Sequence, residues 1–186
     1  AIKRSFGKAN DVPVDVIRAM GDKFVEHSKG KEIAQLSDVA TVKKDFYGIA
    51  ADVLFALFPE FTGEEVEEMV HKAYFGKFQT EEITPTVKVG NDYVLELFRG
   101  PTCAFKDMAL QMLPRLLSAS LVKTGEKRTA CILAATSGDT GSAALAGFRD
   151  VDQTRILVFY PQNGVSRAQQ LQMTTQEGGN VGVCAV

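Results

Sequence analysis

Two short stretches of the sequence carry residue types that can do chemistry. The first, residues 100–107, places Lys106 beside Phe105 and just before an apolar helical run. The start of a helix and partial burial both oppose the charge of a lysine and favour the neutral amine, a nucleophile suited to a Schiff base. A surface lysine paired with Asp107 is the alternative, and position alone favours it.

The second stretch is the loop TSGDTG at residues 136–141, between an apolar run and the start of a predicted helix. Its two glycines let the backbone approach a ligand closely. Its hydroxyl groups and the open N–H groups of a helix start suit a small anion, a carboxylate or a phosphate. The loop is neither a Walker loop nor a GxGxxG loop, and a plain helix cap remains the alternative.

The second half of the chain predicts the elements that position these stretches. Strands are expected over 129–135, 155–160 and 180–186, and helices over 141–148 and 166–175, the latter opened by the capping box Ser166–Gln169. Continuously apolar strands that alternate with helices are typical of a parallel sheet. Ligands bind at the carboxyl ends of such strands, where the loop 136–141 follows the first one.

The residues before 129 predict mainly helices and one hairpin. Residues 1–80 are expected to be a helical region, with helices from Asp11, over 42–58 and from the capping box Thr62–Glu65. Residues 84–89 and 93–98 predict a hairpin, followed by a helix over 105–122 with a kink at Pro114. We therefore expect a helical region, 1–80, and the first part of an α/β domain, 81–186.

Composition narrows the class of protein. The 186 residues carry a net charge of −2, which excludes a strongly basic chain built to hold nucleic acid. No apolar run approaches the roughly 20 residues of a membrane-spanning helix. Three separated cysteines favour a reduced, cytoplasmic protein, and His27 and His71 are not expected to form a metal site. The chain ends inside an apolar run, so we expect the complete protein to be longer.

Three longer segments of the sequence stand out together. Residues 96–111 are ELFRGPTCAFKDMALQ, residues 135–144 are ATSGDTGSAA, and residues 157–181 are LVFYPQNGVSRAQQLQMTTQEGGNV. In this order they resemble segments of the threonine synthases, pyridoxal phosphate enzymes of the tryptophan-synthase-like class. The first is close to the family pattern ELFHGPT-x-AFKD, with Arg99 where His is common. The resemblance covers about residue 60 to 186 and implies a three-layer α/β domain with a parallel sheet, of which this chain holds an N-terminal part.

The resemblance implies roles for single residues. Lys106 matches the lysine that holds pyridoxal phosphate as an imine and then moves protons, and Thr102 is expected near the cofactor. Asp139 is expected to turn away from a bound carboxylate, towards the cofactor ring hydroxyl or Lys106. Asp107 is expected to orient its segment. The residues expected to hold the substrate carboxylate or line the cofactor are Thr136, Ser137, Gly138, Thr140 and Gly141.

The implied reaction converts O-phosphohomoserine and water into threonine and phosphate. A phospho-lyase of the same fold, which releases 2-oxobutyrate, is an alternative that these motifs do not separate. A truncated, non-catalytic binding form is the other alternative, against which the presence of Lys106 counts. The family's glycine-rich loop for the cofactor phosphate lies later in the family pattern and has no equivalent here. A plastid location is the alternative to the cytoplasm.

Overall fold

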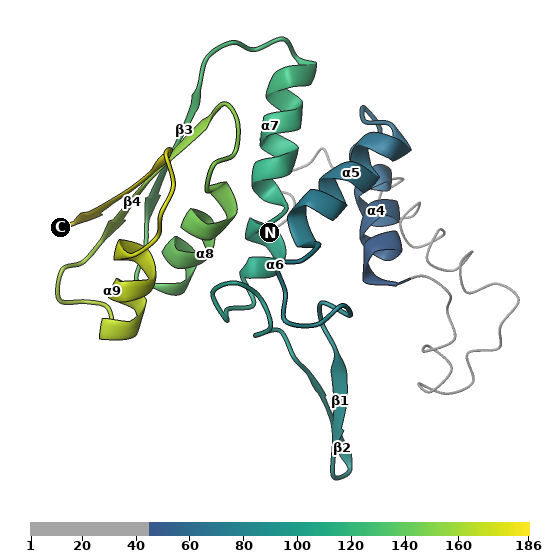
Figure 1. The fold of residues 1–186 in the computed structure, drawn as a ribbon, viewed down its shortest axis with the longest axis horizontal. Coiled ribbons are helices and arrows are strands. Elements are labelled where there is room, and N and C mark those ends of the chain that lie inside the picture. Colours follow the sequence, from purple (N-terminus) through teal and green to yellow (C-terminus); the bar gives the residue numbers. More distant parts are fainter. Residues whose placement is uncertain (1–44) are drawn as a thin grey trace, which may run out of the picture. The chain divides into compact units, whose positions relative to one another are not determined.

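The computed structural model of the chain describes residues 45–186 (Figure 1). It divides into two compact units, Ala1–Val70 and His71–Val186. The helix predicted from Asp11 lies outside the described residues.

The described part of the first unit is helical, as predicted. Helix α4 spans Phe46–Leu57 and begins where the Asp45 side chain accepts a hydrogen bond from the Gly48 N–H at 2.9 Å. Helix α5 spans Gly63–Tyr74 and crosses the boundary between the units. The predicted capping box before α5 is confirmed, because Thr62 N donates to Glu65 Oε2 at 2.7 Å and Glu65 N donates to Thr62 Oγ1 at 3.2 Å.

The predicted hairpin is confirmed with shorter strands. Strands β1, Thr86–Val89, and β2, Asp92–Leu95, pair antiparallel, with Val89 opposite Asp92. Gly90 opens the two-residue turn with a φ of +62°, a conformation that glycine adopts without strain.

The helix predicted over 105–122 is divided into two. Helix α6 spans Asp107–Leu110, and α7 spans Leu113–Lys123 with Pro114 in its first turn. Proline has no N–H and its ring collides with the carbonyl four residues earlier, so it is tolerated at a helix start and not in the interior. Pro114 therefore begins a new helix instead of kinking a continuous one.

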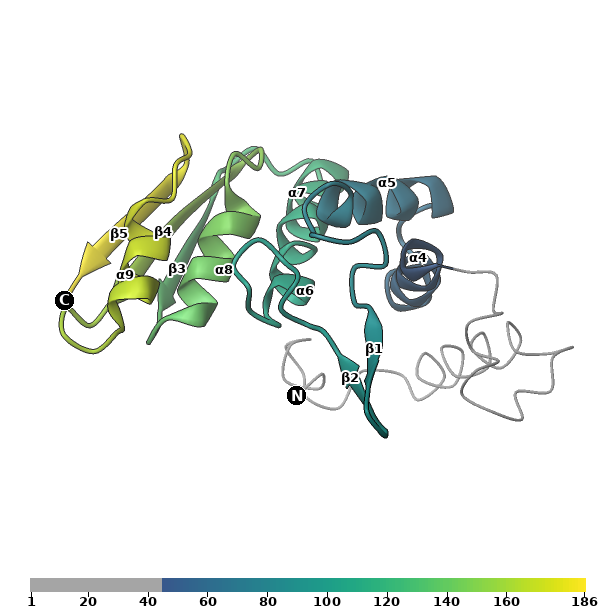
Figure 2. The same cartoon turned by 60° about the horizontal axis from the view of Figure 1, so that its bottom comes forward.

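The predicted parallel sheet is confirmed. Strands β3, Ala130–Ala135, β4, Thr154–Tyr160, and β5, Val181–Ala185, lie in the order β3-β4-β5 and all run parallel. Helix α8, Asp139–Phe148, connects β3 to β4, and α9, Arg167–Thr174, connects β4 to β5. Figure 2 shows α8 and α9 along one face of the three strands.

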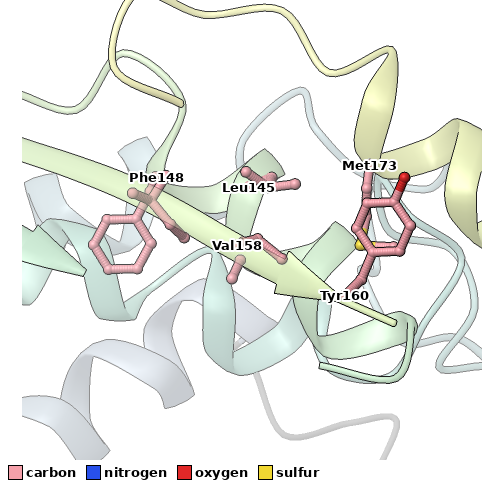
Figure 3. Close-up of a cluster of buried hydrophobic side chains, with 7 residues drawn as sticks. Leu145, Phe148, Val158, Tyr160 and Met173 are labelled. Carbon is pink, nitrogen blue, oxygen red and sulfur yellow. The ribbon is translucent and has the colours of Figure 1, made fainter. Parts of the chain in front are cut away.

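The core of the second unit lies between this face and the helices. Alternate residues of β4, Ile156, Val158 and Tyr160, pack with Leu145 and Phe148 of α8 and Met173 of α9 (Figure 3). Each is at most 4% exposed. Full burial of such a side chain contributes about 1.5–3 kcal/mol, so this cluster fixes α8 and α9 on the sheet.

The opposite face of the sheet carries no helix among residues 45–186. Leu133 on that face is 67% exposed, and its neighbours Cys131 and Arg155 are exposed as well. The described residues thus supply two layers of the predicted three-layer domain.

The Asn180 side chain connects the chain segments at the amino ends of β4 and β5, the end of the sheet opposite the loop 136–141. Its side-chain NH₂ donates to the carbonyls of Phe148 at 2.8 Å and Thr154 at 3.1 Å, and its Oδ1 accepts from Asp150 N at 2.8 Å. The side chain therefore ties the loop before β4 to the start of β5, at the amino ends of these strands.

Residues 45–186 contain no helix long and apolar enough to cross a membrane. Within the same range, no three His, Cys, Asp or Glu side chains gather as metal ligands.

Candidate functional site

Residues 100–107, which we call the lysine loop, surround a buried carboxylate. Asp107 is 0% exposed, and its two oxygens accept from Thr102 N at 2.8 Å and Thr102 Oγ1 at 2.7 Å. A side chain at Gly100 would collide with the Asp107 side chain, so this glycine allows the loop to close over the carboxylate. The geometry supports the predicted role of Asp107 in orienting the segment.

The same loop contains a residue in an unfavourable backbone conformation. Cys103 has a φ of +57°, and its N–H donates to Gly100 O at 3.1 Å in a tight turn. A non-glycine residue in the left-handed region is held there by its surroundings, and such strain concentrates at functional sites.

Lys106 lies directly before α6. Its Nζ is 4.5 Å from the centroid of the Phe105 ring, and the side chain is partly exposed. Helix α6 has four residues, so its dipole is too short to carry the argument that it opposes the lysine charge. Asp107, the partner expected for a surface lysine, has both oxygens engaged by Thr102 instead.

In the loop 136–141 the Thr136 hydroxyl is turned inward. Thr136 Oγ1 accepts from Gly138 N and from Gly141 N, each at 3.1 Å. Gly138 has a φ of +146°, and a side chain at Gly141 would collide with the Thr136 methyl group. These three residues determine the shape of the loop, and the Thr136 hydroxyl is already hydrogen-bonded to backbone N–H groups of the loop itself.

Donors for an anion remain at the start of α8. The first N–H groups of a helix have no carbonyl partner within it, and here the N–H groups of Asp139 and Thr140 lie in that first turn. The hydroxyl side chains of Ser137 and Thr140 are exposed beside them. Together with the positive end of the helix dipole, this arrangement suits a carboxylate or a phosphate.

The Asp139 side chain has a partner that was not expected. Its Oδ1 accepts a hydrogen bond from Gln169 Nε2 of α9 at 2.9 Å. The predicted partners were a cofactor hydroxyl or Lys106.

Helices α8 and α9 bring the two loops together. Gln172 of α9 donates to the Thr102 carbonyl of the lysine loop at 3.2 Å, while Gln169 of the same helix holds Asp139. Helix α6 crosses α8 so closely that a side chain at Gly147 would collide with the Leu110 carbonyl. The lysine loop and the loop 136–141 therefore border one helix, α9.

Arg99, which stands where the family pattern has His, makes hydrogen bonds at the end of the hairpin and not in the lysine loop. Its guanidinium donates to Glu96 Oε2 at 2.7 Å and to Gln79 Oε1 at 3.2 Å.

Three residues that contribute to the site were not identified from the sequence: Gln169, Gln172 and Gly147. The capping box indicated Gln169 only as a cap, and a glycine inside a helix was the available sign of a close approach at Gly147.

No family model matches the chain. A threonine synthase of Pseudomonas aeruginosa is 50% identical over 108 residues, 58% of this chain and 23% of that protein. The threonine synthase of Saccharomyces cerevisiae is 35% identical over 167 residues, 80% of this chain and 32% of that protein. The chain thus spans about a quarter to a third of the length of these curated relatives.

A solved structure agrees with these sequence relatives. The crystal structure of a PLP-bound threonine synthase from Brucella melitensis matches with a TM-score of 0.72 and 38% identity. The match covers 81% of this chain and 32% of that chain. The α/β arrangement with a parallel sheet is therefore the arrangement of the corresponding part of that structure.

Proposed function

The chain is homologous to part of the threonine synthases, and on this basis we propose that the protein is a pyridoxal phosphate enzyme that converts O-phosphohomoserine and water into threonine and phosphate. The observation that carries the proposal is the junction of the lysine loop with the loop 136–141 along α9. A lysine and an anion site on adjacent loops are what an amino-acid substrate bound to this cofactor requires.

The lysine loop fits the cofactor. Lys106 lies within a loop that the hydrogen bonds between Thr102 and Asp107 hold together, and its side chain is partly exposed. Its amine would hold the cofactor covalently, and the bound cofactor would supply an electron sink for the substrate carbanion. Thr102, expected near the cofactor, would act through the loop, because its hydroxyl donates to Asp107.

The loop 136–141 and the Lys106 amine would act on the substrate. The N–H groups of Asp139 and Thr140 and the hydroxyls of Ser137 and Thr140 would bind the substrate carboxylate, while Thr136, Gly138 and Gly141 shape the loop. The Lys106 amine would move protons at the substrate α and β carbons. Phosphate would leave as the bond from the γ carbon to oxygen breaks, and the proton taken from the β carbon would be replaced by one added at the γ carbon, which becomes a methyl group. Water would supply the hydroxyl of the β carbon and a proton to phosphate, so that O-phosphohomoserine and water give threonine and phosphate.

Reductive trapping tests the cofactor assignment. After incubation with pyridoxal phosphate and borohydride, peptide mass spectrometry should place the reduced adduct on Lys106. Lys106→Ala should lose that adduct and at least about 10³-fold of turnover, since both the anchor and the proton carrier are removed. Lys127→Ala, at an exposed lysine in the turn before β3, is the matched control and should retain both.

Product analysis tests the reaction. Threonine and phosphate in equal amounts from O-phosphohomoserine are the expected result. Release of 2-oxobutyrate and ammonia would instead identify a phospho-lyase of the same fold. An adduct spread over many lysines, with no turnover, would contradict the proposal and favour a non-catalytic binding protein. The cytoplasmic location, with a plastid as alternative, and the division after residue 80 remain predictions from the sequence.

A further inference from the structure

Asp139 presents an electrostatic conflict in the proposed site. It is the first residue of α8, and the N–H groups that would bind the substrate carboxylate are its own and that of Thr140. A carboxylate side chain left to rotate there would repel a bound anion or occupy the same N–H groups. The site therefore needs a device that holds the Asp139 carboxylate elsewhere.

Gln169 has the geometry of that device. Its Nε2 donates to Asp139 Oδ1 at 2.9 Å, and its Oε1 accepts from Ser166 N at 3.1 Å. Both ends of one amide are thus fixed, one on the first turn of α8 and the other on the cap of α9. A side chain at Gly138 would collide with the Gln169 amide, so the loop leaves room for this bridge.

The chemistry of the amide matters as much as its position. Capping boxes use Glu or Gln equally well at this place, because only the side-chain oxygen is needed. Only Gln also offers a donor, which the Asp139 carboxylate requires. A Glu at 169 would keep the cap and face Asp139 with a second carboxylate.

We propose, resting on the function proposed above, that Gln169 is a positioning residue that holds the Asp139 carboxylate away from the first turn of α8 and so keeps its N–H groups open to the substrate carboxylate. Gln169 touches neither the substrate nor the cofactor in this role and acts through Asp139. Through Gln172, which donates to the Thr102 carbonyl, the same helix also holds the lysine loop.

Gln169→Glu tests the bridge without removing the cap. The probe is acetate, titrated against the backbone amide signals of Asp139 and Thr140 in NMR spectra of the protein. We expect the affinity for acetate to fall about tenfold, and the Michaelis constant for O-phosphohomoserine to rise by a similar factor with kcat within about twofold. The reduced adduct on Lys106 should be unchanged.

Two controls separate positioning from charge and from capping. Gln170→Glu adds the same charge one residue along α9, where Gln170 accepts from Arg167 at 2.8 Å, and should change acetate affinity less than twofold. Ser166→Ala removes the hydroxyl that accepts from Gln169 N at 3.2 Å and leaves the bridge to Asp139 in place. It should lower thermal stability slightly without changing acetate affinity.

Rescue gives the sharpest outcome. In the double variant Gln169→Glu with Asp139→Asn, donor and acceptor are exchanged and the net charge equals that of the unchanged protein. Acetate affinity and the Michaelis constant should return to within about twofold of the original values. A fall in Gln169→Glu no larger than in Gln170→Glu, or the absence of rescue, would overturn the inference.

The two proposals fail separately. If no adduct forms on Lys106 in the unchanged protein, the proposed function is overturned. The acetate titrations then still decide whether Gln169 holds the Asp139 carboxylate away from the first turn of α8. An adduct on Lys106 together with unchanged acetate affinity in Gln169→Glu leaves the proposed function standing and removes this inference.

Discussion

Lys106 and Asp107 are adjacent in sequence and have opposite environments. Lys106 is partly exposed, whereas Asp107 is fully buried and accepts two hydrogen bonds from Thr102. The position of the lysine is therefore set by its neighbour. The place of Lys106 before a helix could be predicted from the sequence, but the partner of Asp107 could not, because position alone favoured a local salt bridge with Lys106.

Asp107→Asn should disturb this loop with almost no change in volume. An amide in place of the carboxylate can turn its NH₂ only towards Thr102 Oγ1, whose hydroxyl would then have to accept instead of donate, and both hydrogen bonds would lose the charge of the carboxylate. We expect a loss of about 2 kcal/mol in the free energy of unfolding and weaker trapping of cofactor on Lys106. Chemical denaturation measures the first and peptide mass spectrometry the second.

The control for this variant is Asp92→Asn, at an exposed position in the hairpin, which should change stability by less than about 0.5 kcal/mol. Equal stability and equal trapping in the two variants would show that the Asp107 carboxylate does not organise the loop.

Asn180→Ala should weaken the opposite end of the sheet. It removes the donor to the Phe148 and Thr154 carbonyls and the acceptor for Asp150 N. Leaving these groups without partners costs about 2 kcal/mol in free energy of unfolding. Because Asn180 lies at the amino ends of the strands, cofactor trapping on Lys106 should not change below the unfolding transition. A parallel loss of trapping in the folded protein would refute this separation.

At the scale of elements, the close crossing of α6 and α8 at Gly147 determines where the lysine loop lies. Gly147→Ala would place a methyl group against the Leu110 carbonyl, which is backbone and cannot rotate away. We expect a loss of about 3 kcal/mol in free energy of unfolding, measured by chemical denaturation.

Gly63→Ala, at the first residue of α5, is the matched control for Gly147→Ala. A methyl group there meets nothing within 4 Å, so stability should be unchanged or slightly higher. If Gly147→Ala were equally harmless, the two helices would have to separate more easily than this packing implies.

The elements that follow local rules could be predicted from the sequence. The three parallel strands, the hairpin and both capping boxes each depend on residues within a short window. The features that were missed depend on distant residues. The bond from Gln169 to Asp139 and the contact at Gly147 involve tertiary neighbours that no periodic pattern displays. The division of the predicted helix before Leu113 is different, because Pro114 is a local signal that was interpreted as a kink.

At the scale of the molecule, two groups among residues 45–186 make stability depend on pH in the alkaline range. Burial, with the nearby Arg115 charge as a smaller cause, lowers the pKa of Lys77 from 10.5 to about 8. Burial raises the pKa of Tyr74 from 10.0 to about 12. Between pH 8 and 10 the unfolded chain binds more protons at Lys77, so stability rises with pH, and above pH 10 the unfolded chain loses the Tyr74 proton first, so stability falls.

Lys77→Met should remove the rise and keep the fall. Lys77 is only partly buried, so solvent screening limits its contribution to on the order of 1 kcal/mol. Chemical denaturation of the unchanged protein at intervals from pH 7 to 11 should give a maximum near pH 9–10, which Lys77→Met shifts to lower pH. A rise of the same size in the variant would assign the effect to another group.

Helix α8 has a consequence for how natural variation in related proteins should be interpreted. Most of its residues are buried, and small ones predominate: Gly141, Ser142, Ala143, Ala144 and Gly147. At Gly141 a larger side chain would meet Val158 of β4 and Met173 of α9, and at Gly147 it would meet the Leu110 carbonyl of α6. Selection on packing alone would therefore keep these two positions small. A conservation profile would then mark them as strongly as Lys106, and their invariance would be no measure of catalytic importance.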